Sequence, residues 1–240
     1  MLPKIDFNTL KIYQDGAVLS DMVTAAADPM VSGFTTNPTL MAKAGITDYA
    51  GFGKDVIAAI PEKPISFEVF SDEFEEMRRE AHIIQTWGGN IFTKIPIMNT
   101  KGESSLSLIK ELSGQGMALN VTAIFTWEQI ESVSNAISPG KPAIISVFAG
   151  RIADTGIDPM PLMKRAAVLL KSRPRQELLW ASPRELLNLF QADECGCDII
   201  TATPDILNKL SLVGKDLIKF SQETVEMFYN DATASGFSLV

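Results

Sequence analysis

Short runs rich in β-branched and aromatic residues recur along the chain, and segments with helix-like spacing of apolar residues separate them. Neighbouring runs begin roughly 20 to 35 residues apart. Several of these runs alternate apolar and polar positions, which is typical of strands with one buried face. The pattern predicts eight strands: Lys11–Asp15, Val31–Thr36, Ile65–Phe70, Gly88–Ile97, Met117–Thr122, Ala143–Phe148, Glu177–Ser182 and Asp198–Thr203.

This alternation of strands and helices indicates the fold class. Strands separated by helices pair in parallel through right-handed crossovers, and eight such units in 240 residues match the size of an α/β (β/α)8 TIM barrel. A doubly wound open sheet is the alternative. Such a sheet usually has fewer strands, and the turn at residues 14–17 lacks the glycine-rich phosphate loop expected after its first strand. We therefore expect residues 1–240 to form one barrel domain, with residues from about 205 to 240 as a C-terminal helical extension.

Local signals place several helices. Asn37 is a good N-cap and Pro38 a good first helical residue, while Gly45 is a stop signal. Further helices are expected at Asp72–Thr86, Trp127–Ile137 and Arg184–Ala192.

The C-terminal segment has an apolar character that needs a partner. Its apolar residues are roughly helix-spaced, and the chain ends in Gly-Phe-Ser-Leu-Val. This tail either packs on its own barrel or docks on a neighbouring subunit, and the pattern alone favours neither. The apolar residues are Leu210, Val213, Leu217, Phe220, Val225 and Phe228.

Composition and charge exclude several classes of partner. The chain is 46% apolar and 21% charged, which is ordinary for a soluble globular protein. Its net charge of -8, without any block of basic residues, argues against nucleic acid and anionic membrane surfaces as partners. Residues 1–6 contain no apolar run of signal-peptide length, and no segment approaches the roughly 18 apolar residues of a membrane span. These features predict a cytoplasmic protein.

The cysteine and histidine content narrows the possible chemistry. Cys195 and Cys197 are too close for a relaxed disulfide and too few for a zinc site. The single histidine, His82, lies in a charged, helical stretch. Catalytic triads and histidine-based metal sites are therefore disfavoured, and we expect no metal. Catalysis would have to come from Lys, Asp, Glu, Arg, Thr and Ser side chains.

The fourth predicted strand ends on a lysine. Asn90, Phe92 and Lys94 share one face of this strand, and Pro96 follows shortly after. An amine at the end of an apolar strand is partly desolvated, which favours its neutral form. A neutral amine is a nucleophile that forms Schiff bases with carbonyl compounds. Most lysines at strand ends simply reach into water, so Lys94 by itself is a weak indication.

Polar residues at the other strand ends strengthen this interpretation. A (β/α)8 barrel carries its chemistry at the carboxyl ends of its strands. An amine near Asp15 and Glu68 suits Schiff-base catalysis with acid and base partners. Two guanidinium groups and a hydroxyl suit a phosphate. The residues expected at this rim are Asp15, Thr36, Asn37, Glu68, Lys94, Asn120, Thr122, Phe148, Arg151, Ser182 and Arg184.

Five segments resemble the transaldolase family, which includes the fructose-6-phosphate aldolases. Together they span nearly the whole chain in order, and the set is far more specific than any one of them. The segments are Gly33–Leu40, Phe92–Pro96, Asn120–Phe125 with Gln129, Phe148–Ile152 and Trp180–Arg184.

The resemblance implies transfer of a dihydroxyacetone unit between a ketose phosphate and an aldose phosphate, without a cofactor. Lys94 would form the Schiff base, and Asp15 would take the hydroxyl proton as the carbon–carbon bond breaks. Glu68 and Thr122 would hold a water that carries protons. Asn37 and Asn120 would hydrogen-bond substrate hydroxyls or the dihydroxyacetone unit, and Arg151, Ser182 and Arg184 would hold the phosphate. Thr36 and Phe148 are the other residues expected to bind substrate.

Two positions separate transfer from simple cleavage within the family. Its transaldolases resemble this chain in carrying glutamate and phenylalanine at the positions of Glu68 and Phe148, whereas its fructose-6-phosphate aldolases carry glutamine and tyrosine. An aldolase that releases dihydroxyacetone remains the alternative enzyme, and a non-catalytic sugar-phosphate-binding barrel is the alternative outside enzymes. The chain is similar in length to the short subfamily, whose members form rings, which implies a homo-oligomer that is a pentamer or decamer.

Overall fold

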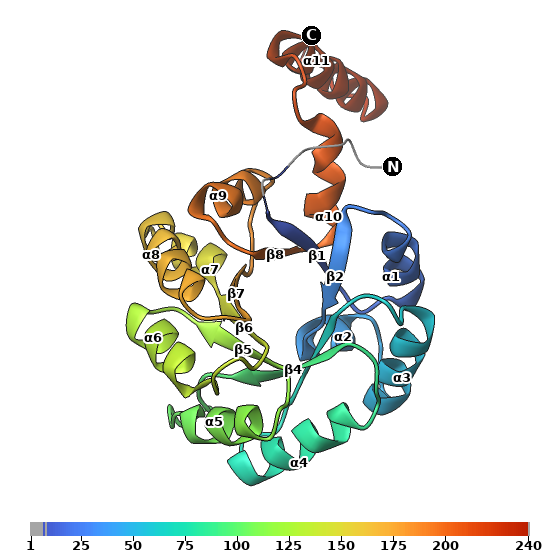
Figure 1. Cartoon of the computed structure of the whole chain (residues 1–240). Coiled ribbons are helices and arrows are strands. Elements are labelled where there is room, and N and C mark those ends of the chain that lie inside the picture. The colour runs from blue at the N-terminus through green and yellow to red at the C-terminus, as the bar shows by residue number, and fades with distance from the viewer. Residues whose placement is uncertain (1–6, 8, 240) are drawn as a thin grey trace.

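The computed structural model describes residue 7 and residues 9–239, which form a closed barrel of eight parallel strands surrounded by helices (Figure 1). Closure is made by β1 pairing with β8, with Lys11 opposite Ile199. The predicted (β/α)8 barrel is therefore confirmed, and the open sheet is wrong. The strands are β1 (Lys11–Asp15), β2 (Val31–Thr35), β3 (Ile65–Glu68), β4 (Ile91–Pro96), β5 (Leu119–Ile124), β6 (Ala143–Val147), β7 (Gln176–Trp180) and β8 (Ile199–Ala202).

Helices cover the outside of the barrel, with the exception of the last one, which stands away from it (Figure 1). Within the described part of the chain, no helix has the length and apolar character needed to cross a lipid bilayer. Residues 1–6, where the sequence indicates no signal peptide, lie outside the described residues, as do Asn8 and Val240. The helices are α1 (Leu19–Ala26), α2 (Pro38–Lys43), α3 (Tyr49–Ala59), α4 (Phe74–Gln85), α5 (Leu106–Gly114), α6 (Trp127–Ala136), α7 (Ala149–Asp154), α8 (Met160–Lys171), α9 (Leu187–Cys195), α10 (Pro204–Leu207), the 3-10 helix η1 (Asn208–Leu212) and α11 (Leu217–Ala234).

The predicted signals at α2 are confirmed. The Asn37 side chain accepts a hydrogen bond from the backbone N–H of Leu40 at 3.0 Å, and Pro38 occupies the first turn. Gly45 follows the helix with φ of +73°, a left-handed conformation that favours glycine. Asn37 is thereby fixed at the point where β2 passes into α2.

The helix after β7 begins later than expected. It starts at Leu187 and not at Arg184, because the side chain of Asn188 accepts hydrogen bonds from the backbone N–H groups of Arg184 and Glu185. These bonds hold a loop between β7 and α9. Arg184 is therefore presented from a loop at the barrel rim.

Two apolar layers stabilise the barrel. The larger one fills the space between the strands and the helices, and a smaller one fills the barrel interior. Every residue of β6 is buried, as expected for a parallel strand that is covered on both faces, and four of its five residues are apolar. The interior layer consists of Tyr13, Ile144, Leu179, Ala181 and Ile199, with Phe92 and Phe148 packed against it.

The C-terminal helix α11 stands away from the barrel (Figure 1). None of its residues is buried, and Leu217 and Ile218 are 78% and 80% exposed. Of the six apolar positions noted in the sequence, Leu210 is buried, but it belongs to η1. The alternative in which the tail packs on its own barrel is therefore wrong for α11.

Candidate active site

A cavity of about 690 Å³ opens at the carboxyl ends of the barrel strands. Nine of the eleven sequence-predicted site residues line it, and Thr36 and Asn120 do not. The nine are Asp15, Asn37, Glu68, Lys94, Thr122, Phe148, Arg151, Ser182 and Arg184. The structure thus gathers groups from the ends of seven strands, β1 to β7, around one space, as the barrel topology predicts.

Lys94 is the buried amine of this cavity. Lys94 is only 7% exposed, and its Nζ lies 3.0 Å from Glu68 Oε2. Lys94 and Glu68 are partners in the parallel pairing of β3 with β4, so the backbone register itself places them side by side. Lys94 Nζ also donates a hydrogen bond to the carbonyl oxygen of Thr36 at 3.1 Å. The amine is therefore held in one position beside a proton acceptor.

Asp15 approaches the same space from the end of β1. Burial raises the pKa of its carboxyl group, and the nearby charge of Glu68 raises it further. The charge of Lys94 and a hydrogen bond from Thr35 Oγ1 at 2.7 Å act in the opposite direction. A carboxyl group whose pKa lies above its ordinary value is suited to proton transfer.

Thr122 faces the cavity with an unsatisfied hydroxyl. Its Oγ1 is buried and has no hydrogen-bond partner among the described residues. The next residue, Ala123, has φ of +59°, an unfavourable conformation for a residue with a side chain. Strain of this kind is often found at functional sites. The Thr122 hydroxyl is available to a substrate or a water.

Thr36 and Asn120 lie behind the cavity wall. Thr36 Oγ1 donates to the carbonyl oxygen of Ser66 at 2.9 Å, so its main chain, and not its side chain, meets Lys94. Asn120 Nδ2 donates to Ser66 Oγ at 2.9 Å, and Ser146 Oγ donates to Asn120 Oδ1 at 2.6 Å. The structure thus places both residues in support of the site, and their contact with a substrate stays a prediction.

The two arginines stand on one side of the cavity. The guanidinium group of Arg151 lies over the ring of Phe148, 5.0 Å from its centroid. Phe148 is in turn 5.6 Å from the ring of Phe125. Arg184 Nε donates to Asp154 Oδ1 at 3.1 Å, and its Nη2 contacts the other oxygen of the same carboxylate. Both cations are therefore oriented before any ligand binds.

Ser182 lines the same cavity and has a constrained backbone. Its φ of +57° is left-handed. The carbonyl oxygen of Ser182 comes so close to Gly150 that a Cβ at Gly150 would lie 1.6 Å from it. Only glycine fits at position 150, one residue before Arg151. This close approach brings the loops after β6 and β7 together at the arginine side of the cavity.

Sequence reasoning missed several lining residues. Thr35 and Ser146 line the cavity, and each lies two residues before a predicted site residue, Asn37 and Phe148. The two-residue alternation of a strand was therefore a signal that identifies both. Thr201 also lines the cavity, on the last strand, where no site residue was predicted.

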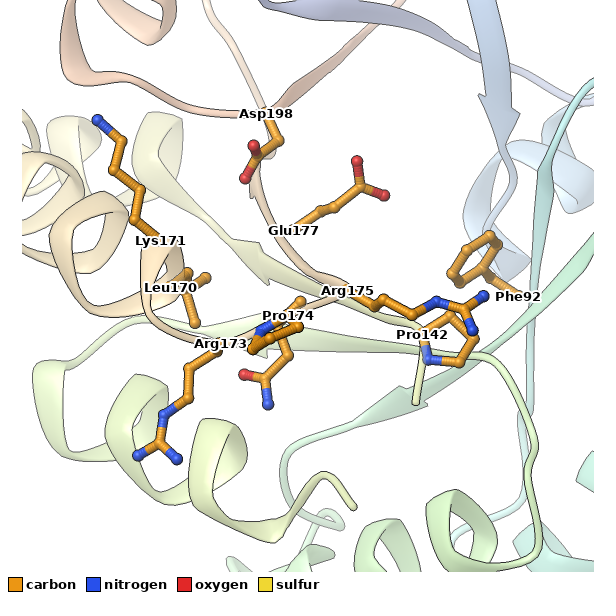
Figure 2. Close-up of a pocket in the computed structure, with 10 residues that line it drawn as sticks. Phe92, Pro142, Leu170, Lys171, Arg173, Pro174, Arg175, Glu177 and Asp198 are labelled. Carbon is orange, nitrogen blue, oxygen red and sulfur yellow. The ribbon is translucent and has the colours of Figure 1, made fainter. Parts of the chain in front are cut away.

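A second cavity, of about 510 Å³, opens at the other end of the barrel (Figure 2). Its carboxylates have partners, because Glu177 pairs with Lys11, and Asp198 Oδ2 accepts the backbone N–H of Leu178 at 2.8 Å. Figure 2 shows Arg173 and Arg175 pointing in different directions. The charges do not converge there, so the cavity around Lys94 is the candidate active site.

Comparisons with known proteins show which proteins the chain as a whole is similar to. The family model described as transaldolase/fructose-6-phosphate aldolase matches residues 12–239. A "probable transaldolase" of Dehalococcoides mccartyi is 31% identical over 202 residues, covering 84% of this chain and 90% of that protein. A "probable transaldolase" of Sphingopyxis alaskensis is 30% identical over 233 residues, covering 96% of this chain and all of that protein (100%).

Among solved structures, the likeness extends to the fold alone. The dihydrodipicolinate synthase of Rhodopseudomonas palustris superposes with a TM-score of 0.58 at 13% sequence identity, covering 95% of this chain and 81% of that one. Such a low identity supports the barrel architecture and carries nothing about activity.

Proposed function

The chain belongs to the transaldolase/fructose-6-phosphate aldolase family, and on that premise we propose that it transfers a dihydroxyacetone unit between sugar phosphates through a Schiff base on Lys94. One observation carries the proposal. The amine of Lys94 is buried at the carboxyl end of β4, 3.0 Å from the Glu68 carboxylate, in the cavity that also contains Asp15.

Schiff-base formation would begin with attack of Lys94 Nζ on the ketone carbon of the donor. The amine must lose a proton to attack, and Glu68 is the nearest acceptor, at 3.0 Å. The oxygen of the carbinolamine then leaves as water after it takes up a proton. A water held between Glu68 and the unpartnered hydroxyl of Thr122 would carry these protons.

Carbon–carbon cleavage would follow with Asp15 as the base. Asp15 takes the proton of the donor hydroxyl, the bond breaks, and an aldose leaves while the electron pair forms an enamine on Lys94. The enamine then attacks the carbonyl carbon of the acceptor, and Asp15 returns the proton to the new hydroxyl. Hydrolysis of the Schiff base releases the product ketose and restores the amine. Atoms balance without a further reactant.

The phosphate would bind between Arg151, Ser182 and Arg184. Planar guanidinium groups recognise phosphate oxygens in pairs, and both arginines line the cavity. Arg184 is held by Asp154, so a phosphate would share or replace that carboxylate as its partner. The positive charges of the two arginines would also attract anionic substrates to the cavity, although the chain as a whole is acidic.

Transfer is favoured over release by the residues at two positions. Release of free dihydroxyacetone requires a proton for the enamine carbon. Phe148 lines the cavity, and its phenyl ring has no proton to give. Glu68 at the Schiff-base lysine is the residue typical of the transferring members of the family. The enamine would therefore normally react with an acceptor aldose.

Assembly into a homo-oligomer, a ring of five or ten copies, is part of the proposal. The apolar side chains of α11 are exposed, including Leu217, Ile218 and Phe228. A helix with such a face needs a partner. We infer that α11 docks on a second copy of the chain. The chain is similar in length to the short subfamily, whose members form rings, and the barrel of the same chain leaves α11 uncovered.

A two-substrate assay tests the proposed function. With fructose 6-phosphate and erythrose 4-phosphate, we expect glyceraldehyde 3-phosphate and sedoheptulose 7-phosphate in equal amounts. With fructose 6-phosphate alone, we expect little turnover. Rapid release of dihydroxyacetone without acceptor would instead indicate the aldolase, and no turnover with binding would indicate a sugar-phosphate-binding barrel.

A further inference from the structure

Three side chains from adjacent strands form a hydrogen-bonded chain beside Lys94. Thr35 Oγ1 on β2 donates to Asp15 Oδ1 on β1 at 2.7 Å. Thr201 Oγ1 on β8 lies 2.5 Å from Thr35 Oγ1. Thr35 and Thr201 are buried, and all three residues line the cavity. The strands on both sides of β1 therefore contribute to holding its terminal carboxylate.

The direction of this chain follows from proton counting. A threonine hydroxyl has one hydrogen to donate. Thr35 gives its hydrogen to Asp15, so Thr201 must donate to Thr35. Every proton in the chain points toward the carboxylate, and successive hydrogen bonds polarise one another. The arrangement stabilises Asp15 in its ionised form.

We propose that Thr201 is a positioning residue that acts through Thr35 to hold Asp15 Oδ1, which leaves Oδ2 free to accept the substrate proton. The inference rests on the proposed function, in which Asp15 is the base for carbon–carbon cleavage. Thr201 and Thr35 keep their own protons throughout. Only Asp15 gains one, and it returns that proton to the product hydroxyl.

Two charged groups face Asp15 besides this chain, Lys94 from β4 and Glu68 from β3. Burial and Glu68 raise the pKa of Asp15, whereas Lys94 and the Thr35 hydrogen bond lower it. Removal of Thr201 weakens the bond from Thr35, so the carboxylate is less stabilised and its pKa rises. Because the base must be ionised to work, the acid limb of the rate profile moves to higher pH.

Thr201→Val tests this role by removing the hydroxyl with little change in shape. We expect kcat for transfer to fall about tenfold, the upper end of the cost of one hydrogen bond between neutral groups, and the acid limb of the pH–rate profile to move to higher pH. Borohydride trapping of the donor on Lys94 is expected to stay at the wild-type level, because Schiff-base formation precedes the step that needs Asp15. Thr201→Ser restores the donor and is expected to recover kcat.

Thr93→Val is the matched control. Thr93 is a buried barrel threonine, but its hydroxyl accepts a hydrogen bond from Gln85 on α4 at 2.9 Å, outside the barrel. We expect its kcat and pH profile to match the wild type. Equal losses in Thr93→Val and Thr201→Val would show that the effect is general destabilisation and would overturn the assignment. A wild-type pH profile in Thr201→Val would overturn it as well.

A titration separates this inference from the proposed function. The carboxyl carbon of Asp15 can be followed by NMR in protein with ¹³C-labelled aspartate, with or without any turnover. We expect a higher Asp15 pKa in Thr201→Val than in the wild type. An unchanged pKa would contradict the positioning role even if transfer activity were established, and a raised pKa would support it even if no sugar substrate were found.

Discussion

Glu68 and Lys94 face each other across β3 and β4, with 3.0 Å between Glu68 Oε2 and Lys94 Nζ. Both side chains are largely buried at the floor of the cavity. The contact is set by strand register, and it does not depend on a flexible loop. A site built on paired strands holds its reacting groups closely, which proton transfer requires.

The Glu68→Gln variant tests this pair. Glutamine keeps the shape but cannot accept the proton of the lysine, so we expect kcat to fall about 100-fold, the scale of a lost general base. Rapid-quench trapping with borohydride is expected to show slower Schiff-base formation. Glu177→Gln, an acidic residue paired with Lys11 at the opposite end of the barrel, is the control and is expected to keep wild-type rates. An unaltered trapping rate in Glu68→Gln would argue against the role of Glu68.

Phe148→Tyr tests the choice between transfer and release. The new hydroxyl would lie in the cavity, where it can protonate the enamine, so we expect several-fold more free dihydroxyacetone from fructose 6-phosphate without acceptor. Phe125→Tyr adds the same group to the neighbouring ring, which is 5.6 Å away and does not line the cavity, and is expected to leave release unchanged. Equal release from both variants would mean that the hydroxyl at position 148 has no special role.

Arg184→Ala tests the phosphate site. Loss of a charge-assisted contact typically costs about 1.5 to 3 kcal/mol, so we expect KM for fructose 6-phosphate to rise about 10- to 100-fold with a small change in kcat. KM for unphosphorylated fructose is expected to stay the same. Arg173→Ala, at the other end of the barrel, is the control. If Arg184→Ala raised both KM values equally, Arg184 would not be a phosphate ligand.

The exposed helix α11 leads to a prediction about assembly. Phe228 lies on the apolar face of α11 and is 62% exposed. The substitution Phe228→Glu therefore disturbs little packing within the chain itself. We expect this variant to lower the oligomeric mass measured by light scattering, while Glu226→Gln on the polar face leaves it unchanged. A wild-type mass for Phe228→Glu would show that α11 does not hold the copies together.

The fold was predictable from the sequence because each strand has a recognisable pattern of apolar residues and a helix-containing segment separates it from the next strand. The boundaries of the strands were less predictable. The third strand ends at Glu68 and not at Phe70, because the N–H groups of Phe70 and Ser71 bond to the Glu80 carboxylate. That bond comes from α4, so no local pattern indicates it.

The site was predictable down to which strand ends carry reactive groups, but side-chain direction was not. Asn120 shares a face of its strand with Thr122, yet its side-chain amide is hydrogen-bonded to Ser66 and Ser146 and does not line the cavity. Thr36 is followed by the cavity residue Asn37, yet its hydroxyl bonds to Ser66. These outcomes depend on partners from other strands. The periodic pattern of α11 also did not predict the partner of this helix, since the same apolar spacing is expected whether the helix packs on its own barrel or on another copy of the chain.

The proposed function depends most directly on a Schiff base between Lys94 and the donor sugar. Incubation with fructose 6-phosphate, reduction with borohydride and intact-mass analysis test it directly, with peptide mapping to locate the adduct. We predict one dihydroxyacetone-derived adduct per chain, located on Lys94, and none in Lys94→Met. No adduct in the wild type, or an adduct that persists in Lys94→Met, would contradict Schiff-base chemistry on Lys94.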